Sequence, residues 1–91
     1  MLSADLERTT DIQSQLRRFI IDNFLFGDDS QEIPETDSFL QTNLIDSTGI
    51  LELVHFVEQT FRITVEDEEL IPENLDSLAN VTHFVVRKCE V

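Results

Sequence analysis

The sequence predicts a small all-α protein: a four-helix bundle with three longer helices, one short helix and a long loop between the first and second helices. Apolar residues recur at three- and four-residue spacings in three separate stretches. The chain holds only two glycines and two prolines, which is too few for a turn-rich all-β domain. Its 91 residues, 41% of them hydrophobic, suit one modest core, so we expect a single domain over residues 1–91.

The first helix is expected over residues 10–25. Its apolar residues at helical spacing are Ile12, Leu16, Phe19 and Ile20, with Phe24 following. Gly27 is a stop signal near the end of this pattern. Residues 1–9 either extend the helix by a turn or two or fray.

Residues 28–46 are expected to form a long connection, because Pro34, four Asp and several Ser or Thr favour turns over a regular element. A connection of this length inside a compact domain needs to be held in place or to have a function. The apolar side chains expected to hold it are Ile33, Phe39 and Leu44. Residues 38–42 have room for one short helical turn.

The second helix is expected from Ser47 or Thr48 to about Phe61. Steps of about 100° per residue place a core stripe on one side, made of Ile50, Val54, Val57 and Phe61 with Leu53 at its edge. The opposite side carries Thr48, Glu52, His55 and Gln59. Leu51 lies roughly a quarter-turn from the core stripe, beside Glu58, and is a candidate for contact with a partner.

The last third of the chain predicts an extended link, a short helix around residues 66–70, and a final helix that begins near Asp76 or Ser77. Either residue is a suitable N-cap. The apolar face of the final helix consists of Leu78, Val81, Phe84 and Val85. The Arg87-Lys88 pair suits the negative end of its dipole.

The formal charge of −13, from 19 acidic against 6 basic residues, restricts the partners. Nucleic acids and anionic membrane surfaces both need clustered Lys and Arg, so neither is expected to bind. No stretch approaches the roughly 20 apolar residues of a membrane span. Basic protein surfaces are the expected partners, because charge steers a small acidic domain onto them.

The single cysteine, Cys89, cannot form an internal disulfide, and the first residues lack the basic and apolar parts of a signal peptide. We therefore expect a cytoplasmic protein, and a monomer.

Patterns for catalysis or metal binding are weak. His55 and His83 are far apart and have no cysteine at metal-ligand spacing, so no zinc site is expected. The acidic loop lacks the ligand alternation of a calcium-binding loop. Residues Ser47 and His55, eight apart on one helix, do not make a nucleophile–base pair. We expect no enzymatic activity and no metal.

Ser47 remains the residue of interest. At a helix start a serine is most often a cap, and either Asp46 or Ser47 fits that role. The wider arrangement adds to this reading. An apolar-held loop ends at Leu44-Ile45-Asp46-Ser47, and an acidic amphipathic helix follows at once.

This arrangement resembles the acyl carrier protein family, whose members are small acidic four-helix bundles. In that family an Asp-Ser-Leu motif opens the second helix, and here the residues are Asp46-Ser47-Thr48. The resemblance implies that Ser47 carries 4′-phosphopantetheine, attached from coenzyme A by a separate phosphopantetheinyl transferase. The thiol of that arm would hold an acyl group as a thioester and deliver it to acyl- or aminoacyl-ligases, synthases or transferases that have basic docking surfaces. The partner-binding positions implied are Asp46, Thr48, Leu51, Glu52, His55 and Glu58.

The chain departs from the family pattern at three positions. Thr48 replaces the usual Leu, Gly49 replaces an acidic residue, and His55 stands where Met is common. A glycine two after the serine also occurs in D-alanyl and some aminoacyl or peptidyl carriers. The departures favour a specialised stand-alone carrier of a lipid or secondary-metabolite pathway, with fatty acyl, hydroxyacyl or aminoacyl cargo. The alternatives are an aminoacyl, D-alanyl or peptidyl carrier, and an acidic helical interaction module that is never modified.

Overall fold

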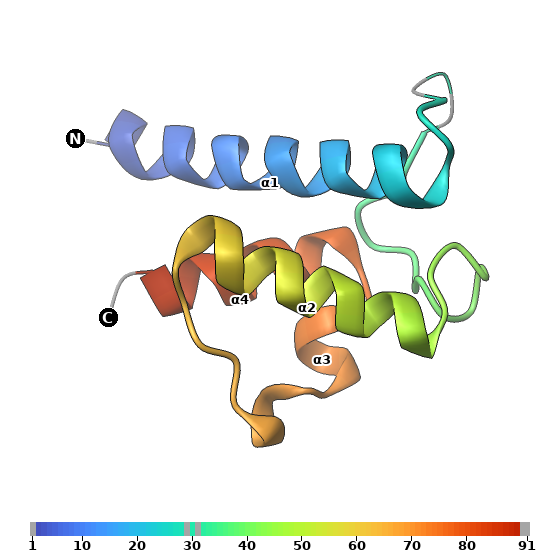
Figure 1. The fold of residues 1–91 in the computed structure, drawn as a ribbon. Helices are drawn as coiled ribbons and strands as arrows, with labels where there is room; N and C mark the ends of the chain where they lie inside the picture. The colour runs from blue at the N-terminus through green and yellow to red at the C-terminus, as the bar shows by residue number, and fades with distance from the viewer. Residues whose placement is uncertain (1, 29, 31, 90–91) are drawn as a thin grey trace.

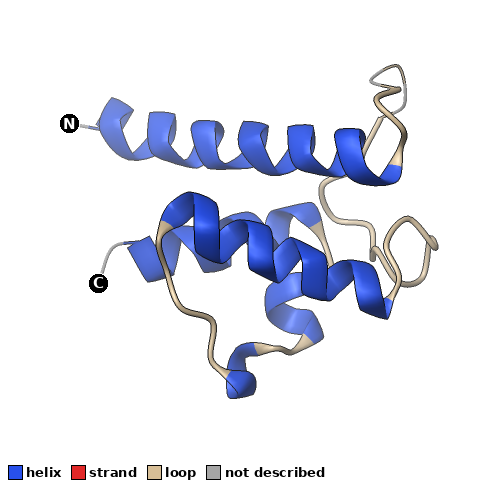
Figure 2. Ribbon diagram, viewed as in Figure 1, coloured by secondary structure: helices blue, strands red, loops and turns tan. Residues whose placement is uncertain are grey.

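The computed structural model describes residues 2–28, 30 and 32–89, with side chains from Thr9 onward. The elements in chain order are α1 (Leu2–Phe24), α2 (Ser47–Phe61), the 3₁₀ turn η1 (Asp67–Glu69), α3 (Pro72–Leu75) and α4 (Leu78–Cys89). Figure 2 shows helices and loops without a strand over these residues. The predicted all-helical bundle of three longer helices and one short helix is confirmed.

α1 packs mainly on α4 and runs antiparallel to α2 (Figure 1). As a result, the C-terminal end of α1 and the N-terminal end of α2 lie at the same end of the bundle, here called the Ser47 end. The short α3 packs against α4. This arrangement leaves α2 with α1 along one flank and with the chain from η1 to α3 along the other.

One core holds these helices together. Buried side chains come from all four helices and from the long loop, and the largest fully buried ones are Leu16, Ile20, Phe39, Ile45, Leu53, Leu78 and Phe84. Burial of a side chain of this size stabilises the fold by about 1.5–3 kcal/mol. Loop residues are therefore part of the core and do not merely connect the helices.

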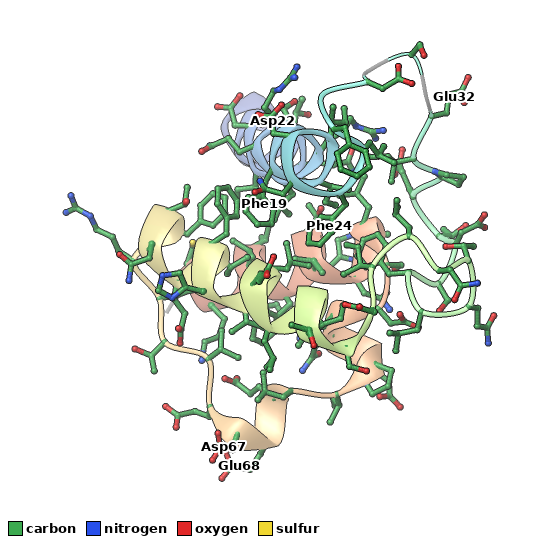
Figure 3. The ribbon with its side chains drawn as sticks, turned by 45° about the vertical axis from the view of Figure 1, so that its right-hand side comes forward. Phe19, Asp22, Phe24, Glu32, Asp67 and Glu68 are labelled. Carbon is green, nitrogen blue, oxygen red and sulfur yellow. The ribbon has the colours of Figure 1, made fainter. Side chains whose placement is uncertain are left out.

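Four half-buried phenylalanines fill the space between α1 and α2. The rings of Phe19 and Phe56 stack at a centroid distance of 4.2 Å. Phe24 meets Phe19 edge-on at 6.0 Å, and Phe61 meets Phe56 edge-on at 6.2 Å. Phe19 and Phe24 both point from α1 toward α2 in Figure 3. Stacked and edge-on pairs are the favourable arrangements of aromatic rings, so α1 and α2 associate largely through this row.

The long loop is held as expected at Ile33 and Phe39, which are buried. Leu44 is only half-buried. The fully buried residue beside it is Ile45, which was not among the residues expected to hold the loop. The expected turn at 38–42 is present as a bond from the Thr42 N–H to the Ser38 carbonyl, 3.1 Å.

Asp76 ties this loop to the α3–α4 junction. Its carboxylate accepts hydrogen bonds from the Ser38 hydroxyl and from the Leu40 N–H (3.0 Å for the latter). Its backbone carbonyl accepts from the Phe39 N–H at 2.8 Å. Asp76 was expected only as a possible cap of the last helix. The cap is Ser77, whose hydroxyl oxygen accepts from the Asn80 N–H at 3.1 Å.

α1 begins at Leu2, so of the two alternatives for the first residues, extension of the helix is the one observed over residues 2–9; Met1 lies outside the described residues. Two other expectations need correction. The helix expected at residues 66–70 is only the 3₁₀ turn η1, and the separate helix α3 follows it, opened by Pro72 at a position where a missing N–H is tolerated. On α2 the core stripe is centred on Leu53 and Val57, whereas the predicted members Ile50 and Phe61 are only half-buried.

Within the described part of the chain, no helix combines the length and the apolar content needed to cross a membrane. Over the same residues, no cluster of three or more His, Cys, Asp or Glu side chains is placed to hold a metal ion.

Candidate functional site at the start of α2

Asp46 caps α2, and Ser47 is the first helical residue. The Asp46 carboxylate accepts from the Gly49 N–H at 2.7 Å, and its backbone carbonyl accepts from the Ile50 N–H at 2.9 Å. Asp46 has the extended backbone typical of an N-cap. Because the neighbouring residue supplies the cap, the exposed Ser47 hydroxyl is not needed for it.

The first turn of α2 is suited to hold an anion close to Ser47. The first N–H groups of any α-helix have no partner inside the helix. These groups, together with the helix dipole, favour a negative group there by about 0.3–1 kcal/mol. A phosphodiester on the Ser47 oxygen would lie beside this turn.

Gly49 brings that turn close to the end of α1. It is buried, and a Cβ atom built on it would lie 2.8 Å from Cε1 of Phe24 and 2.6 Å from Cγ2 of Ile45. Real Cβ atoms essentially never approach other atoms so closely. Any larger residue here would therefore have to displace Phe24 or Ile45, which gives a steric reason for one departure from the carrier pattern.

An open, mostly apolar pocket of about 210 Å³ lies against Ser47, between α2 and the chain from Leu70 to Asp76. Its apolar lining comes from three parts of the chain: Leu40 of the loop, Ile50 and Leu51 of α2, and Leu70, Ile71, Pro72 and Leu75. Small exposed apolar residues are common singly, but a group of large ones marks a contact surface.

Four of these lining residues are also large side chains that remain exposed: Leu40, Leu51, Leu70 and Ile71, with Leu51 the most exposed of them at 59%. Leu51 was predicted to be exposed from the helical pattern. The other three were not selected, because nothing in the local sequence of the loop or of residues 70–71 indicates that they lie beside Ser47.

The predicted partner-binding residues divide into two groups. Thr48, Leu51, Glu52 and His55 are exposed and border one shallow groove between α1 and α2, floored by Phe19 and Phe56. The structure therefore brings these four together on one face.

Asp46 and Glu58 have structural roles in addition. Asp46 is the cap described above. Glu58 is half-buried, and its carboxylate accepts from the Val65 N–H at 2.9 Å, which fixes the link that leaves α2. Of the two acidic residues predicted on the helix face, Glu52 is thus the one whose carboxylate is exposed.

Charge is distributed unevenly over the molecule. Three of the six basic residues, Arg62, Arg87 and Lys88, lie at the C-terminal ends of α2 and α4, away from the Ser47 end. Lys88 pairs there with Glu69 at 2.9 Å. The Glu66 N–H, and then the Lys88 ammonium, hold the pKa of Glu69 below its ordinary value.

Fewer basic groups balance the carboxylates around Ser47. Arg18 pairs with Asp22 on α1 at 2.8 Å, and hydrogen bonding from Arg18 lowers the pKa of that carboxyl group. Figure 3 shows Asp22 on the outer side of α1, opposite the phenylalanines that face α2. The surface around Ser47 is therefore apolar at the pocket and acidic around it.

The chemistry of this site is presentation of a hydroxyl group. His55 and the exposed Ser47 lie on the same helix about two turns apart, and the residues described around Ser47 supply carboxylates and apolar side chains. Neither the family models nor the solved structures contain a match to this chain.

Proposed function

We propose that this protein is a carrier whose Ser47 is modified with 4′-phosphopantetheine, as its likeness to the acyl carrier proteins implies. The observation that supports the proposal most strongly is the exposed Ser47 hydroxyl at the first position of α2, with the cap supplied by Asp46. A phosphopantetheinyl transferase provides the arm from coenzyme A. Partner ligases and synthases load the thiol of the arm and receive its cargo.

The pocket beside Ser47 supports a short cargo. Pockets that enclose small molecules usually measure about 300–1,000 Å³, and this one measures about 210 Å³ and is open to solvent. A long fatty acyl chain would remain partly in water there. A short acyl, hydroxyacyl or aminoacyl group fits better, and it would suit a specialised pathway rather than bulk fatty-acid synthesis.

The second candidate is an interaction module that is never modified. The exposed side chains of Leu40, Leu51, Leu70 and Ile71 support it as well, because a basic protein with an apolar contact surface would bind the same face. The two functions differ in one respect: only the carrier needs the Ser47 oxygen.

Intact mass spectrometry separates them. The protein is incubated with coenzyme A, Mg²⁺ and a broad-specificity transferase. We expect one phosphopantetheine to be added to the wild type and none to Ser47→Ala. Thr60→Ala is the matched control, since it removes an exposed hydroxyl from the other end of α2 and leaves both the Asp46 cap and Ser47 in place. It should still be modified. A wild type that gains no mass with several transferases would leave the interaction module as the better proposal.

A further inference from the structure

Most of the large apolar side chains that remain exposed lie in one place. Four of them surround the pocket at Ser47. The fifth, Phe26, follows α1 and is 96% exposed, far more than any of the others. An aromatic side chain left almost entirely in water gains nothing from the hydrophobic effect in the free protein.

The backbone at Phe26 adds a second observation. Phe26 has a φ of 55°, in the left-handed region that bulky residues rarely adopt, and Gly27 follows with a φ of 80°. The Gly27 N–H donates to the Ile21 carbonyl at 2.9 Å. This bond closes the turn formed by residues 25–27 after α1, here called the hook. Strained backbone of this kind tends to persist where function requires it. A glycine or asparagine would fit this position with less strain.

The hook lies at the Ser47 end. Phe24, two residues before Phe26, packs on Gly49, two residues after Ser47. Figure 1 shows the end of α1 and the start of α2 on the same side of the molecule. A protein that covers this end of the bundle would therefore reach both Ser47 and the residues that follow α1.

The charge of this region indicates what kind of surface covers Phe26. The exposed residue Asp28 follows it in the chain, and Asp46 and Glu52 lie at the start of α2, whereas Asp22 on the preceding turn is paired with Arg18. A second copy of this chain would bring two strongly negative surfaces together, given a net charge of −13. A basic protein surface with an apolar pocket is complementary to both features.

We propose that Phe26 anchors the enzyme that modifies Ser47, by entering an apolar pocket bordered by basic residues on that enzyme. The identity of the partner rests on the proposed function above. An aromatic side chain that fills a pocket on the partner can contribute strongly to a protein interface, and the hook holds this ring away from its own chain.

The test compares the stability of variants with the rate at which they are modified. Phe26→Gly removes the ring and suits the left-handed backbone, so the thermal midpoint should be unchanged or higher than that of the wild type. With coenzyme A and the transferase, kcat/KM for the protein substrate should fall by about 10-fold to 30-fold, through KM. Phe26→Asn, which also tolerates this backbone, should behave in the same way. Phe26→Tyr, which keeps the ring, should stay within about threefold of the wild type.

Asn43→Gly is the matched control. Asn43 is another exposed residue with a positive φ, 62°, in the loop before α2. This variant relieves backbone strain without removing a ring, and its kcat/KM should stay within about twofold of the wild type. If Phe26→Gly is modified at the wild-type rate, or if Asn43→Gly loses as much, the proposal is wrong. A wild type that is never modified would instead contradict the proposed function.

Discussion

The two flanks of α2 are built differently. Toward α1, phenylalanine rings and the close contact of Phe24 with Gly49 fill the space beneath the shallow groove described above. Toward η1 and α3, the space is an open pocket with apolar side chains at its edges.

The segment on the open side is held from elsewhere. η1 and α3 are fixed to α4 by the Glu69–Lys88 pair and by a hydrogen bond from Arg87 to Asn74, 3.1 Å. They are fixed to the long loop through Asp76. A small bundle can therefore leave apolar surface open beside one serine. The segment that forms the far wall of the pocket is held by polar bonds and by the buried side chain of Leu75, so it does not need to fill the space against α2.

The largest expected effect comes from removing the loop side chain that supports the open flank. Phe39 is 1% exposed, and its N–H donates to the Asp76 carbonyl. Phe39→Ala should lower the free energy of unfolding by about 3–5 kcal/mol, through lost burial and the cavity left behind. Urea denaturation measures this loss. Leu40→Ala, at the neighbouring exposed position, should cost much less. Equal losses for the two variants would show that the loop is not held through Phe39.

A smaller effect is expected on the flank of α2 that faces α1. Gly49→Ala would place a Cβ atom against Phe24 and Ile45. Overpacking of this kind costs about 1–3 kcal/mol, and the better helix propensity of alanine offsets part of it. Thermal or urea denaturation would detect the loss. Thr48→Ala, one position earlier and exposed, serves as the comparison and should change stability by no more than about 0.5 kcal/mol. A stabilised Gly49→Ala variant would mean that the helix start and the end of α1 are not in close contact.

The smallest effect concerns the bonds that hold η1. The pKa of Glu69 is lowered from its ordinary 4.5 in the folded protein, so its carboxylate form stabilises the fold. That contribution is fully present above pH 4.5 and is lost as the pH falls through the lowered folded value. Glu69→Gln should therefore have a lower thermal midpoint than the wild type at neutral pH, and the difference should shrink in acid and in high salt.

Glu68→Gln provides the control for this series, because Figure 3 shows Glu68 at the tip of η1 pointing away from the bundle. Its difference from the wild type should depend little on pH. If the difference between Glu69→Gln and the wild type stays constant from neutral pH into acid, the pair with Lys88 does not contribute as described.

The helices with long apolar periodicity were predictable from the sequence. α2 and α4 follow from repeats of three and four residues and from acceptable caps at their starts. α3 was missed because a helix of four residues shows no periodicity, and Pro72 is as common in a turn as at a helix start. The helical pattern also placed Leu51 correctly on the surface. It wrongly made Ile50 a central member of the core stripe and Leu53 an edge member, whereas Leu53 is fully buried and Ile50 is half-buried.

The site was predictable in its chemistry and less so in its surroundings. The Asp46-Ser47 step indicated both a cap and an exposed hydroxyl, and the structure assigns the cap to Asp46. Leu40 and Leu70 reach the pocket from segments about 30 residues apart in sequence, and no local pattern shows that proximity. The role of Gly49 depends on the position of Phe24, which only the packing of two helices determines.

The division of roles between Asp46 and Ser47 has a consequence for thermodynamic linkage. A group that binds the folded and unfolded chain equally does not shift the folding equilibrium. Since the helix start is secured by Asp46, a group attached covalently to Ser47 replaces no bond on which folding depends. If Ser47 carries a phosphodiester, as proposed above, modification and folding would therefore be linked only through the free N–H groups and the dipole of the helix start, by about 0.3–1 kcal/mol.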